Sequence, residues 1–563
     1  MNIVKVSLAA AALLAVSLPG ISHACGGFFC QLVPINQAAE QIVFRQDGDQ
    51  VTAMVQIQFA GNAEDFSWVV PVPSIPEFEI GSNRAFTDLE SATRPDFNLI
   101  ETGSACFAPE FDVPLASVAD SAAESGDTDG GAVIVESVQD VGGYEVSVIS
   151  GDNAEAVTQW LIDNDYDLTQ QGRDLLAPYV EEGMKFVAAR LQQNRGLGSI
   201  QPLIMKYQSE KPVVPIRLTA VAALEDMGVI VWLLGDSRAV PENYLHVIPN
   251  YTRLDWFNGP FNAYGSYQQL ITDAMDEAGG QGFATDYAGR FSDLSDQLTQ
   301  VADLEETLSR FADSPDTEFL ALVQNAFFND AIVQETIAAS LPLRDDQPPF
   351  LLNDQNFLAS NFTAAELSAA RNTVDTVIRA EIIAPLQLSL DVLAGDRYMT
   401  RLYTTLSAED MTLDPSFVFN NDMGDQQLSR NATLDINCID DRDHWTLTLG
   451  EGTGRNGEVV VDTINPVPFA PLPITQEAGF RFEETAAAGQ PVVTEQRDFA
   501  VASLGSPGPG ISNGGGSVDG ETTTGNGTTT DGGMVDSGGS GGGGFGASVL
   551  MLMLMLISLL RRR

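Results

Sequence analysis

The sequence predicts an α+β protein whose parts follow one another along the chain. Strand-like runs broken by Asp-Gly, Gly-Asn and Pro-rich turns dominate its first part. Apolar residues at helical spacing dominate residues 261–397, and β-rich segments return over 398–502. A Gly/Ser/Thr-rich linker at 503–544, which cannot bury a core, and one short apolar segment at 545–560 complete the order.

A β-rich to α+β domain is expected over residues 25–260. In EQIVFRQDGDQVTAMVQIQF, the pair Asp47-Gly48 lies between two strand-like runs and indicates a hairpin. AVIVESVQDVGGYEVSVIS predicts a second hairpin, and AEAVTQWLIDN and GRDLLAPYVEEG have helical spacing. Three stretches after them are predicted as strands: MKFVAARL, PIRLTAVAA and GVIVWLLGD.

Predicted helices in the next region cover 267–278, 293–311 and 317–338. The longest helix starts at Thr363, because Glu366 three residues later completes a capping box. Pro385 is expected to kink or end it. Three later segments are predicted as strands that are candidates to return to the first sheet: RLYTTL, ATLDINCI and HWTLTLGEGTGRNGEVVVDTI.

The first 24 residues have the layout of a secretory signal. One early cation, Lys5, precedes an apolar stretch and a Pro-Gly break, and Ser22-His23-Ala24 stands before Cys25. We therefore expect export through the Sec translocon and cleavage by signal peptidase after Ala24. Lipidation of Cys25 is the alternative.

The uncharged segment 545–560 spans about 24 Å as a helix, somewhat less than a hydrocarbon core of about 30 Å. Three arginines behind it favour the cytoplasmic side and leave the body of the protein outside: Arg561, Arg562 and Arg563. Four glycines precede it: Gly541, Gly542, Gly543 and Gly544. This tail resembles GlyGly-CTERM sorting signals, which implies cleavage in the glycine region by a rhomboid-type protease, rhombosortase. A plain C-terminal inner-membrane anchor is the alternative.

The charge of the chain disfavours two classes of partner. The chain has 28 Lys and Arg against 77 Asp and Glu, a formal net charge of −49. Nucleic acid and anionic lipid surfaces need clustered cations, so binding to either is disfavoured. Cation binding is compatible with this balance, although solubility of an exported protein also explains it.

The four cysteines are expected to form disulfides in an oxidising compartment, where three pairings are possible. Cys25 and Cys30 enclose a short loop with two glycines. The preferred pairing is therefore Cys25–Cys30 with Cys106–Cys438, and the second bond would join the beginning of the fold to its end. A cysteine nucleophile is disfavoured because nothing nearby supplies a base.

The chain has three histidines, and one of them lies in the signal. The remaining two are too few for the usual histidine-based catalytic and zinc sites. The chain also lacks a GxSxG elbow, a P-loop and a dinucleotide fingerprint. The catalytic candidates are Asp236 and Arg238, which follow a buried-strand pattern, and His246 in the next strand-like segment. The favoured interpretation is structural: an Asp-stabilised turn or an Asp–Arg pair, and a histidine hydrogen-bonded at a sheet edge.

The candidates for a hard cation such as calcium lie in CIDDRDHWTL: Asp440, Asp441, Asp443 and His444. A calcium loop has a longer alternation and a terminal Glu. A solvated acidic turn between two strands is therefore favoured.

Glycines in EAGGQGFATDYAGRF follow the predicted helix that ends near Glu277. Gly279, Gly280 and Gly282 are suited to cap that helix or to let a ligand approach the backbone. The sequence does not distinguish a helix cap from a ligand-binding loop at these glycines.

Several stretches together resemble an exported bacterial family catalogued as domain of unknown function 2330. They are CGGFFCQ, EDFSWVVPVPSIP, GMKFVAARL, IRLTAVAA, MGVIVWLLGDSRAVPENYLHV, DEAGGQGFATDYAG and YMTRLYTTLSAEDMTLDP, which together cover about residues 25–420. The resemblance implies an envelope or extracellular protein with a C-terminal sorting tail. It implies no reaction, so it assigns no catalytic residue.

The leading hypothesis is an exported envelope or surface-displayed protein with a non-catalytic binding, adhesion or structural role. One alternative is a secreted hydrolase that uses carboxylates, with or without calcium. The other is a periplasmic sensor or assembly factor anchored in the inner membrane.

Overall fold

The computed structural model describes residues 37–56, 66–106, 134–164, 166, 169–192, 200–221, 223–256, 260–344, 346–464 and 476–499. All of these residues belong to one compact unit. The predicted signal peptide, Cys25, Cys30, the linker and the C-terminal segment lie outside the described residues. In the part of the chain that is described, no helix is both long enough and apolar enough to cross a membrane.

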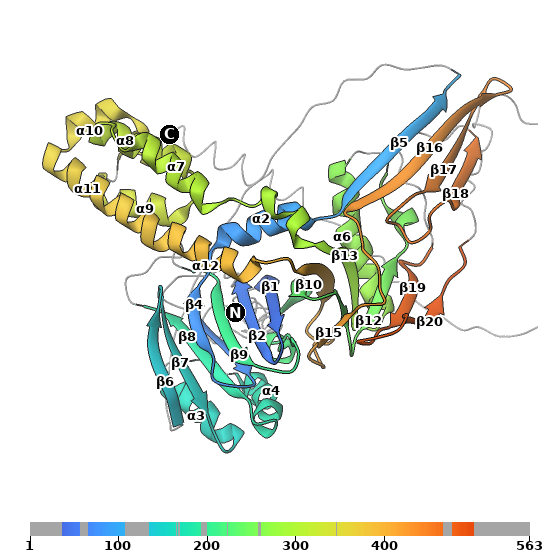
Figure 1. Ribbon diagram of the computed structural model, residues 1–563, viewed down its shortest axis with the longest axis horizontal. Coiled ribbons are helices and arrows are strands. Elements are labelled where there is room, and N and C mark those ends of the chain that lie inside the picture. Colours follow the sequence, from blue (N-terminus) through green and yellow to red (C-terminus); the bar gives the residue numbers. More distant parts are fainter. Residues whose placement is uncertain are drawn as a thin grey trace, which may run out of the picture. The chain divides into compact units, whose positions relative to one another are not determined.

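The fold is α+β, as predicted, and its largest sheet has ten strands (Figure 1). Their order is β20-β19-β12-β13-β14-β10-β1-β2-β9-β4. The bounds are β1 Gln37–Asp47, β2 Gln50–Gln56, β4 Glu77–Ile80, β9 Leu203–Gln208, β10 Ala223–Gly235, β12 Leu245–Pro249, β13 Gly282–Arg290, β14 Tyr398–Leu406, β19 Gly479–Glu484 and β20 Val492–Gln496. β1 runs parallel to β10 and β12 parallel to β13, and the other neighbours are antiparallel.

The first predicted hairpin is confirmed: β1 and β2 pair from Gln41–Gln56 to Asp47–Gln50, and Gly48 in the turn has φ +63°. Successive side chains of a strand point to opposite faces of its sheet. On β1, Phe44 therefore faces a core that includes Val70, while Val43 faces a different core that includes Trp232. The ten-stranded sheet thus buries both of its faces along β1.

A second sheet, in the order β3-β8-β7-β6, packs against the first of these cores. Its strands are β3 Ser67–Val72, β6 Ile134–Val141, β7 Tyr144–Ser150 and β8 Lys185–Leu191. The hairpin of β6 with β7 and the strand β8 agree with the prediction. Helices α3 Ala154–Asp163 and α4 Gln170–Glu181 cover the far face of this sheet with an apolar layer that includes Trp160, Leu176 and Tyr179.

Helix α2, Asn83–Thr93, covers the other face of the ten-stranded sheet together with α12, Ala384–Leu393. Phe86 of α2 packs edge-on against Trp232, and the Trp232 indole N–H donates to Thr93 Oγ1 at 2.9 Å. This packing on the sheet fixes the position of α2 and of its N-terminus.

The helices that follow share a core of their own (Figure 1). They are α7 Val301–Phe311, α8 Asp316–Ala326, α9 Ala331–Ser340, α10 Gln355–Asn361 and α11 Ala364–Val377. The Thr363–Glu366 capping box is confirmed. Pro385 does not end the helix, because a π-helical turn, η7 at Ile378–Ile383, precedes it and lets the chain continue into α12.

The third sheet, β18-β17-β16-β5, shares a core with helix α6, Pro260–Glu277. Its strands are β5 Asp96–Ser104, β16 Ser429–Ile439, β17 Arg442–Leu449 and β18 Val459–Ile464, and a separate pair joins β11 Arg238–Pro241 to β15 Phe417–Asn420. The disulfide Cys106–Cys438 links the end of β5 to β16, which confirms that predicted pairing.

Several local predictions were wrong. PIRLTAVAA is not a strand: it contains one helical turn, α5 at Ile216–Thr219, where Asp414 Oδ1 accepts from the Arg217 backbone N–H at 3.0 Å. A strand, β13, also interrupts the region predicted as helical, because GFATDYAG pairs with β14 on one side and β12 on the other. Both differences arise from partners distant in sequence.

Candidate functional site

The first predicted catalytic residue, Asp236, lies apart from the other two. Its side chain is 93% exposed at the turn between β10 and β11, and Oδ1 pairs with Arg397 Nη1 at 3.0 Å. Arg397 also pairs with Asp47. Asp236 is therefore part of a surface ion-pair group, and its arginine partner is Arg397 rather than Arg238.

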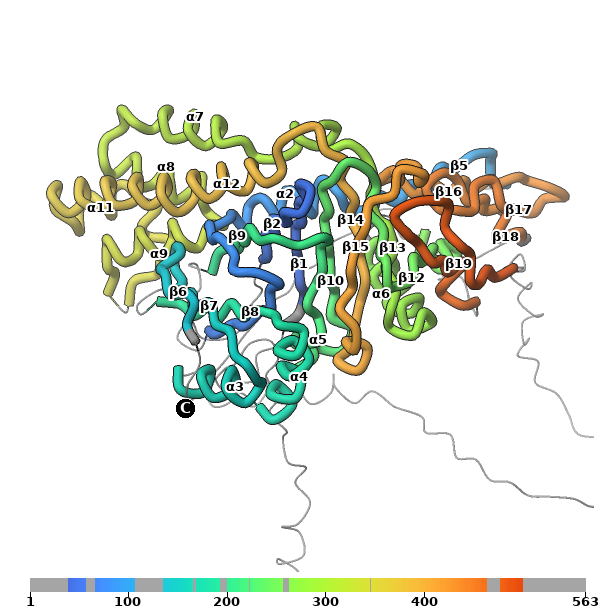
Figure 2. The backbone as a smooth tube through the Cα atoms, turned by 60° about the horizontal axis from the view of Figure 1, so that its bottom comes forward, coloured from blue at the N-terminus to red at the C-terminus, as the bar shows by residue number. Residues whose placement is uncertain are grey.

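Arg238 and His246, in contrast, meet through a residue that the sequence did not single out. The fold brings together Arg238 of β11, Thr285 of β13 and His246 of β12. All three residues are buried, with exposures of 7%, 7% and 2%, respectively. Arg238 Nη2 donates to Thr285 Oγ1 at 3.1 Å, and Thr285 Oγ1 lies 3.0 Å from His246 Nε2. Figure 2 shows β12, β13, β14 and β10 side by side along this part of the sheet.

Glu483 on β19 completes the chain of contacts, since its Oε2 lies 2.9 Å from His246 Nδ1. Burial lowers the pKa of His246 below its ordinary value, and the hydrogen bond to Glu483 opposes this shift. A neutral imidazole with its proton on Nδ1 satisfies every contact: it donates to Glu483 and accepts from the Thr285 hydroxyl. We call Arg238, Thr285, His246 and Glu483 the buried relay.

The connectivity of the relay, hydroxyl to imidazole to carboxylate, is that of a nucleophile, a base and an orienting group. A nucleophile must also reach a substrate. Because Thr285 and His246 are both buried, the arrangement as it stands holds β11, β12, β13 and β19 together rather than presenting a reactive atom.

A second buried cluster lies one residue along β13. Asp286 is the extra residue of a bulge against β14 and forms an ion pair with Arg401, Oδ2 to Nε 3.2 Å. Arg401 also pairs with Glu90 of α2 at 2.8 Å, and the Tyr267 hydroxyl donates to Asp286. Sequence reasoning missed this cluster, although Thr-Asp inside an apolar strand was a signal, because charged side chains are rarely fully buried unless paired.

The four calcium candidates all lie on the hairpin of β16 and β17, and two of them, Asp440 and His444, line a cavity of about 490 Å³. Asp440 and Asp441 form the turn between β16 and β17 with φ +51° and +57°, as in a type I′ turn. Asp443 Oδ1 accepts from the Cys106 backbone N–H at 2.6 Å, and His444 Nε2 pairs with Asp462 Oδ1 at 2.6 Å. Within the described ranges, no three His, Cys, Asp or Glu side chains gather as a metal site.

The glycines after α6 form a helix cap. The Gly280 N–H donates to the Met275 carbonyl at 2.9 Å and the Gly279 N–H to the Asp276 carbonyl at 2.9 Å. Both glycines have φ +71°. This is a Schellman motif, which accounts for Gly279 and Gly280 without a ligand, whereas Gly282 is the first residue of β13.

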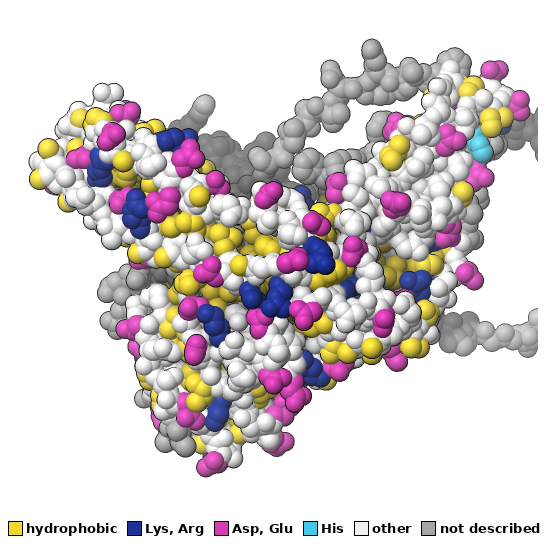
Figure 3. All heavy atoms as spheres, in the orientation of Figure 1, with side chains coloured by type: hydrophobic (Ala, Val, Ile, Leu, Met, Phe, Trp, Pro, Cys, Tyr) yellow, Lys and Arg dark blue, Asp and Glu magenta, His cyan; other side chains and the backbone are white. Residues whose placement is uncertain are grey.

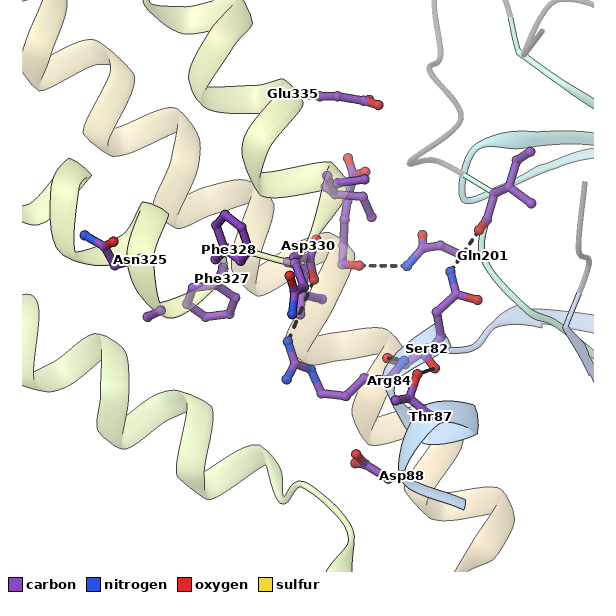
Figure 4. Close-up of a pocket in the computed structure, with 18 residues that line it drawn as sticks. Ser82, Arg84, Thr87, Asp88, Gln201, Asn325, Phe327, Phe328, Asp330 and Glu335 are labelled. Carbon is purple, nitrogen blue, oxygen red and sulfur yellow. Dashed lines mark hydrogen bonds and ion pairs between the residues drawn. The ribbon is translucent and has the colours of Figure 1, made fainter. Parts of the chain in front are cut away.

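A cleft of about 770 Å³ lies elsewhere, and none of the predicted residues lines it (Figure 4). Its wall comes from four segments: 82–88 of α2 and its N-cap, 200–201 before β9, 325–335 across the end of α8 and the start of α9, and 381–382 of η7. Ligand sites in proteins commonly have volumes of roughly 300–1,000 Å³. The cleft is therefore the candidate binding site.

Hydrogen bonds between segments distant in sequence fix the wall of the cleft. Gln201 Nε2 donates to the Glu381 carbonyl at 2.8 Å and joins the segment before β9 to η7. Asn83 Nδ2 donates to the Ile200 carbonyl at 3.0 Å and joins α2 to that same segment. The cleft is thus held open by contacts between distant parts of the chain.

The predicted continuous helix 317–338 concealed this site. It is broken at 327–330: Phe327 is the C-cap of α8, and Asp330 is the N-cap of α9 and accepts from the Val333 N–H at 3.4 Å. The pair Asn329-Asp330 was the available signal, because Asn and Asp favour helix N-caps. The break projects side chains into the space next to α2.

A family model for uncharacterized proteins conserved in bacteria, DUF2330, matches residues 19–338, which is more than half of the chain. The chain belongs to the DUF2330 family. No curated protein matches it significantly. The search of solved structures also found no significant match.

The DUF2330 match includes most of the cleft but not all of it. The segments 82–88, 200–201 and 325–335 lie inside it, and 381–382 lies beyond its end. The relay is divided in the same way, because Arg238, Thr285 and His246 are inside the match and Glu483 is outside. Residues after 338 therefore complete both features of this DUF2330 protein.

Proposed function

We propose that this DUF2330 protein is an exported envelope or surface protein that binds a ligand without catalysing a reaction. The observation that carries the binding role is the cleft of about 770 Å³. None of its lining residues is His or Cys, and the Ser82 hydroxyl is occupied by the Arg84 N–H as a helix cap. The cleft thus offers binding groups but no paired nucleophile and base.

A hydrolase built from the predicted candidates receives no support from their positions. Asp236 pairs with Arg397 on the surface, His246 is buried in the relay, and Asp443 lies at the hairpin of the third sheet. These side chains occupy three separate places, whereas acid–base catalysis requires two groups within reach of the same substrate atom.

The disulfide Cys106–Cys438 supports export, because such bonds persist mainly in oxidising compartments. The acidic composition is consistent with an exposed, soluble body: on the face drawn in Figure 3, Asp and Glu side chains are scattered over the surface. In this proposal the Sec translocon and signal peptidase process the N-terminus. The terminal segment holds the protein in the inner membrane until a rhomboid-type protease cuts the glycine region.

Cell fractionation combined with intact-mass measurement of the full chain tests this proposal. We expect the protein in the envelope or medium fraction, with a mature N-terminus at Cys25 and no reactive thiol at Cys106 or Cys438. Loss of the residues after the glycines Gly541 to Gly544 is the expected mark of processing. Full-length protein in the cytoplasm with free thiols would overturn the export proposal, and an envelope protein with an intact tail would overturn the processing step alone.

A further inference from the structure

The charges of the cleft restrict the ligands that it can accept. Arg84 is the one cationic side chain among its lining residues, whereas four lining residues are acidic: Asp88, Asp330, Glu335 and Glu381. The whole chain also has a net charge of −49. An anionic ligand such as a phosphate or an acidic sugar would be repelled, so the ligand is neutral or cationic.

Several polar groups of the wall have unused hydrogen-bonding capacity. Arg84 forms a long ion pair with Asp330, Nη2 to Oδ2 4.0 Å, which is beyond hydrogen-bond distance (Figure 4). Among the described residues, the Arg84 guanidinium donates no hydrogen bond, and the exposed side chains of Asn329 and Glu335 form none. The wall therefore presents donors, acceptors and an amide that has both.

An aromatic ring stands at the rim of the cleft. Phe328 is 71% exposed, whereas its neighbour Phe327 is 2% exposed and packs into the helical core. The break between α8 and α9 places Phe328 beside Asn329 and Asp330 in the lining. A large ring left in water next to polar groups offers an apolar face to a ligand that is otherwise hydrophilic.

These features together match the chemistry of a saccharide. A pyranose ring has an apolar C–H face that stacks on an aromatic ring, and its hydroxyls both donate and accept hydrogen bonds. An extended peptide would normally pair with a free strand edge, and none of the lining residues belongs to a strand. We propose that the cleft binds an uncharged oligosaccharide, which stacks on Phe328 and hydrogen-bonds to Arg84, Asn329 and Glu335. This inference rests on the binding role proposed above.

Calorimetric titration of the detergent-solubilised full chain tests the ligand class. The neutral probes are maltohexaose, cellohexaose and chitohexaose, and the charged probes are hexagalacturonate and hexalysine. We expect at least one neutral probe to bind, with hexagalacturonate showing no measurable affinity. If none of the three neutral probes binds at millimolar concentration, the saccharide inference fails.

Two phenylalanine variants locate the site. Phe328→Ala is expected to weaken binding of the neutral probe at least tenfold, while Phe350→Ala leaves it unchanged. Phe350 is a matched control because it is 67% exposed on the helical part and does not line the cleft. Equal affinity of Phe328→Ala and the wild type overturns the assignment to this cleft. Thermal unfolding of both variants shows whether either one perturbs the fold.

Two further measurements distinguish a failure of the saccharide inference from a failure of the proposed binding function. One uses the variant Arg84→Gln, and the other uses hexalysine as the probe. Arg84→Gln is expected to weaken the neutral probe about fivefold to tenfold, because a charge-assisted donor to a hydroxyl is lost. If hexalysine alone binds and Phe328→Ala abolishes its binding, the cleft is a binding site for a cationic peptide. That result would retain the binding function and reject the saccharide.

Discussion

At the scale of single residues, Thr285 connects two other members of the buried relay. One hydroxyl accepts from Arg238 and contacts His246, and the imidazole in turn contacts Glu483. Each group is buried, so each hydrogen bond replaces water that cannot enter. The relay therefore joins four buried polar side chains into one network, in which Arg238 Nε is the buried atom without a hydrogen-bond partner.

We expect Thr285→Val to lower the free energy of unfolding by about 1–3 kcal/mol, because Arg238 Nη2 and His246 Nε2 both lose their partner in the core. Thr285→Ser is the matched variant: it keeps the hydroxyl and loses one methyl group, for about 1 kcal/mol. Urea unfolding measures both. Equal stabilities of the valine and serine variants would contradict the network.

The protonation of His246 predicts a pH dependence. Its pKa is lowered in the folded state by burial, from an ordinary value of 6.5, so below that pH the unfolded chain binds a proton that the folded chain excludes. Stability is then lost progressively as the pH falls through the ordinary value of 6.5 and below it. The fall should be smaller in His246→Gln, measured by urea unfolding at several pH values. A fall of the same size in the variant would assign the pH dependence to other groups.

At the scale of secondary-structure elements, the ends of helices form part of the cleft and lead into the strand that contains the buried polar residues. The break between α8 and α9 creates the rim of the cleft, and the π-helical turn η7 contributes Glu381 to its wall. The Schellman motif after α6 reverses the chain into β13, which holds Thr285 and Asp286. Helix termini thus place the polar residues, while the helix bodies supply the core.

Two neighbouring glycines give a test of the α6 cap. Gly279 and Gly280 both have φ +71°, but a Cβ at Gly279 would meet open space, whereas one at Gly280 would overlap the Asp410 side chain. Gly279→Ala should cost about 1 kcal/mol for the left-handed backbone. Gly280→Ala should cost about 1–3 kcal/mol more, because Asp410 must also move. Thermal unfolding compares the stabilities of the two variants. An equal loss of stability would show that the Asp410 side chain moves aside without a measurable cost.

At the scale of the whole molecule, strands from distant parts of the chain complete one sheet. β14 lies between β13 and β10, and β19 pairs with β12, although β14 and β19 come after the end of the DUF2330 match. Without β14, two central strands would expose unpaired backbone groups and apolar side chains. We therefore expect that the matched region does not fold by itself.

A chain truncated after residue 338 should be insoluble or unfolded, because β10 and β13 lose the strand between them. A chain truncated after residue 502 keeps every described strand and should remain soluble with cooperative thermal unfolding. Soluble expression and circular dichroism distinguish the two. Cooperative unfolding of the shorter chain would contradict the dependence on β14.

Local sequence patterns were sufficient to predict the α+β class, the hairpins β1–β2 and β6–β7 and the Thr363 cap, because turn residues and side-chain period act over a few neighbours. The Cys106–Cys438 pair was also predicted, because the short glycine-containing loop between Cys25 and Cys30 favoured pairing those two with each other. Only the tertiary structure decided the strand order, the relay and the cleft. His246 and Glu483 are 237 residues apart, and Gln201 and the Glu381 carbonyl are 180 apart, so their contact depends on how the sheets and helices pack. Contacts between residues so distant in sequence produce no periodic sequence pattern from which they could be predicted.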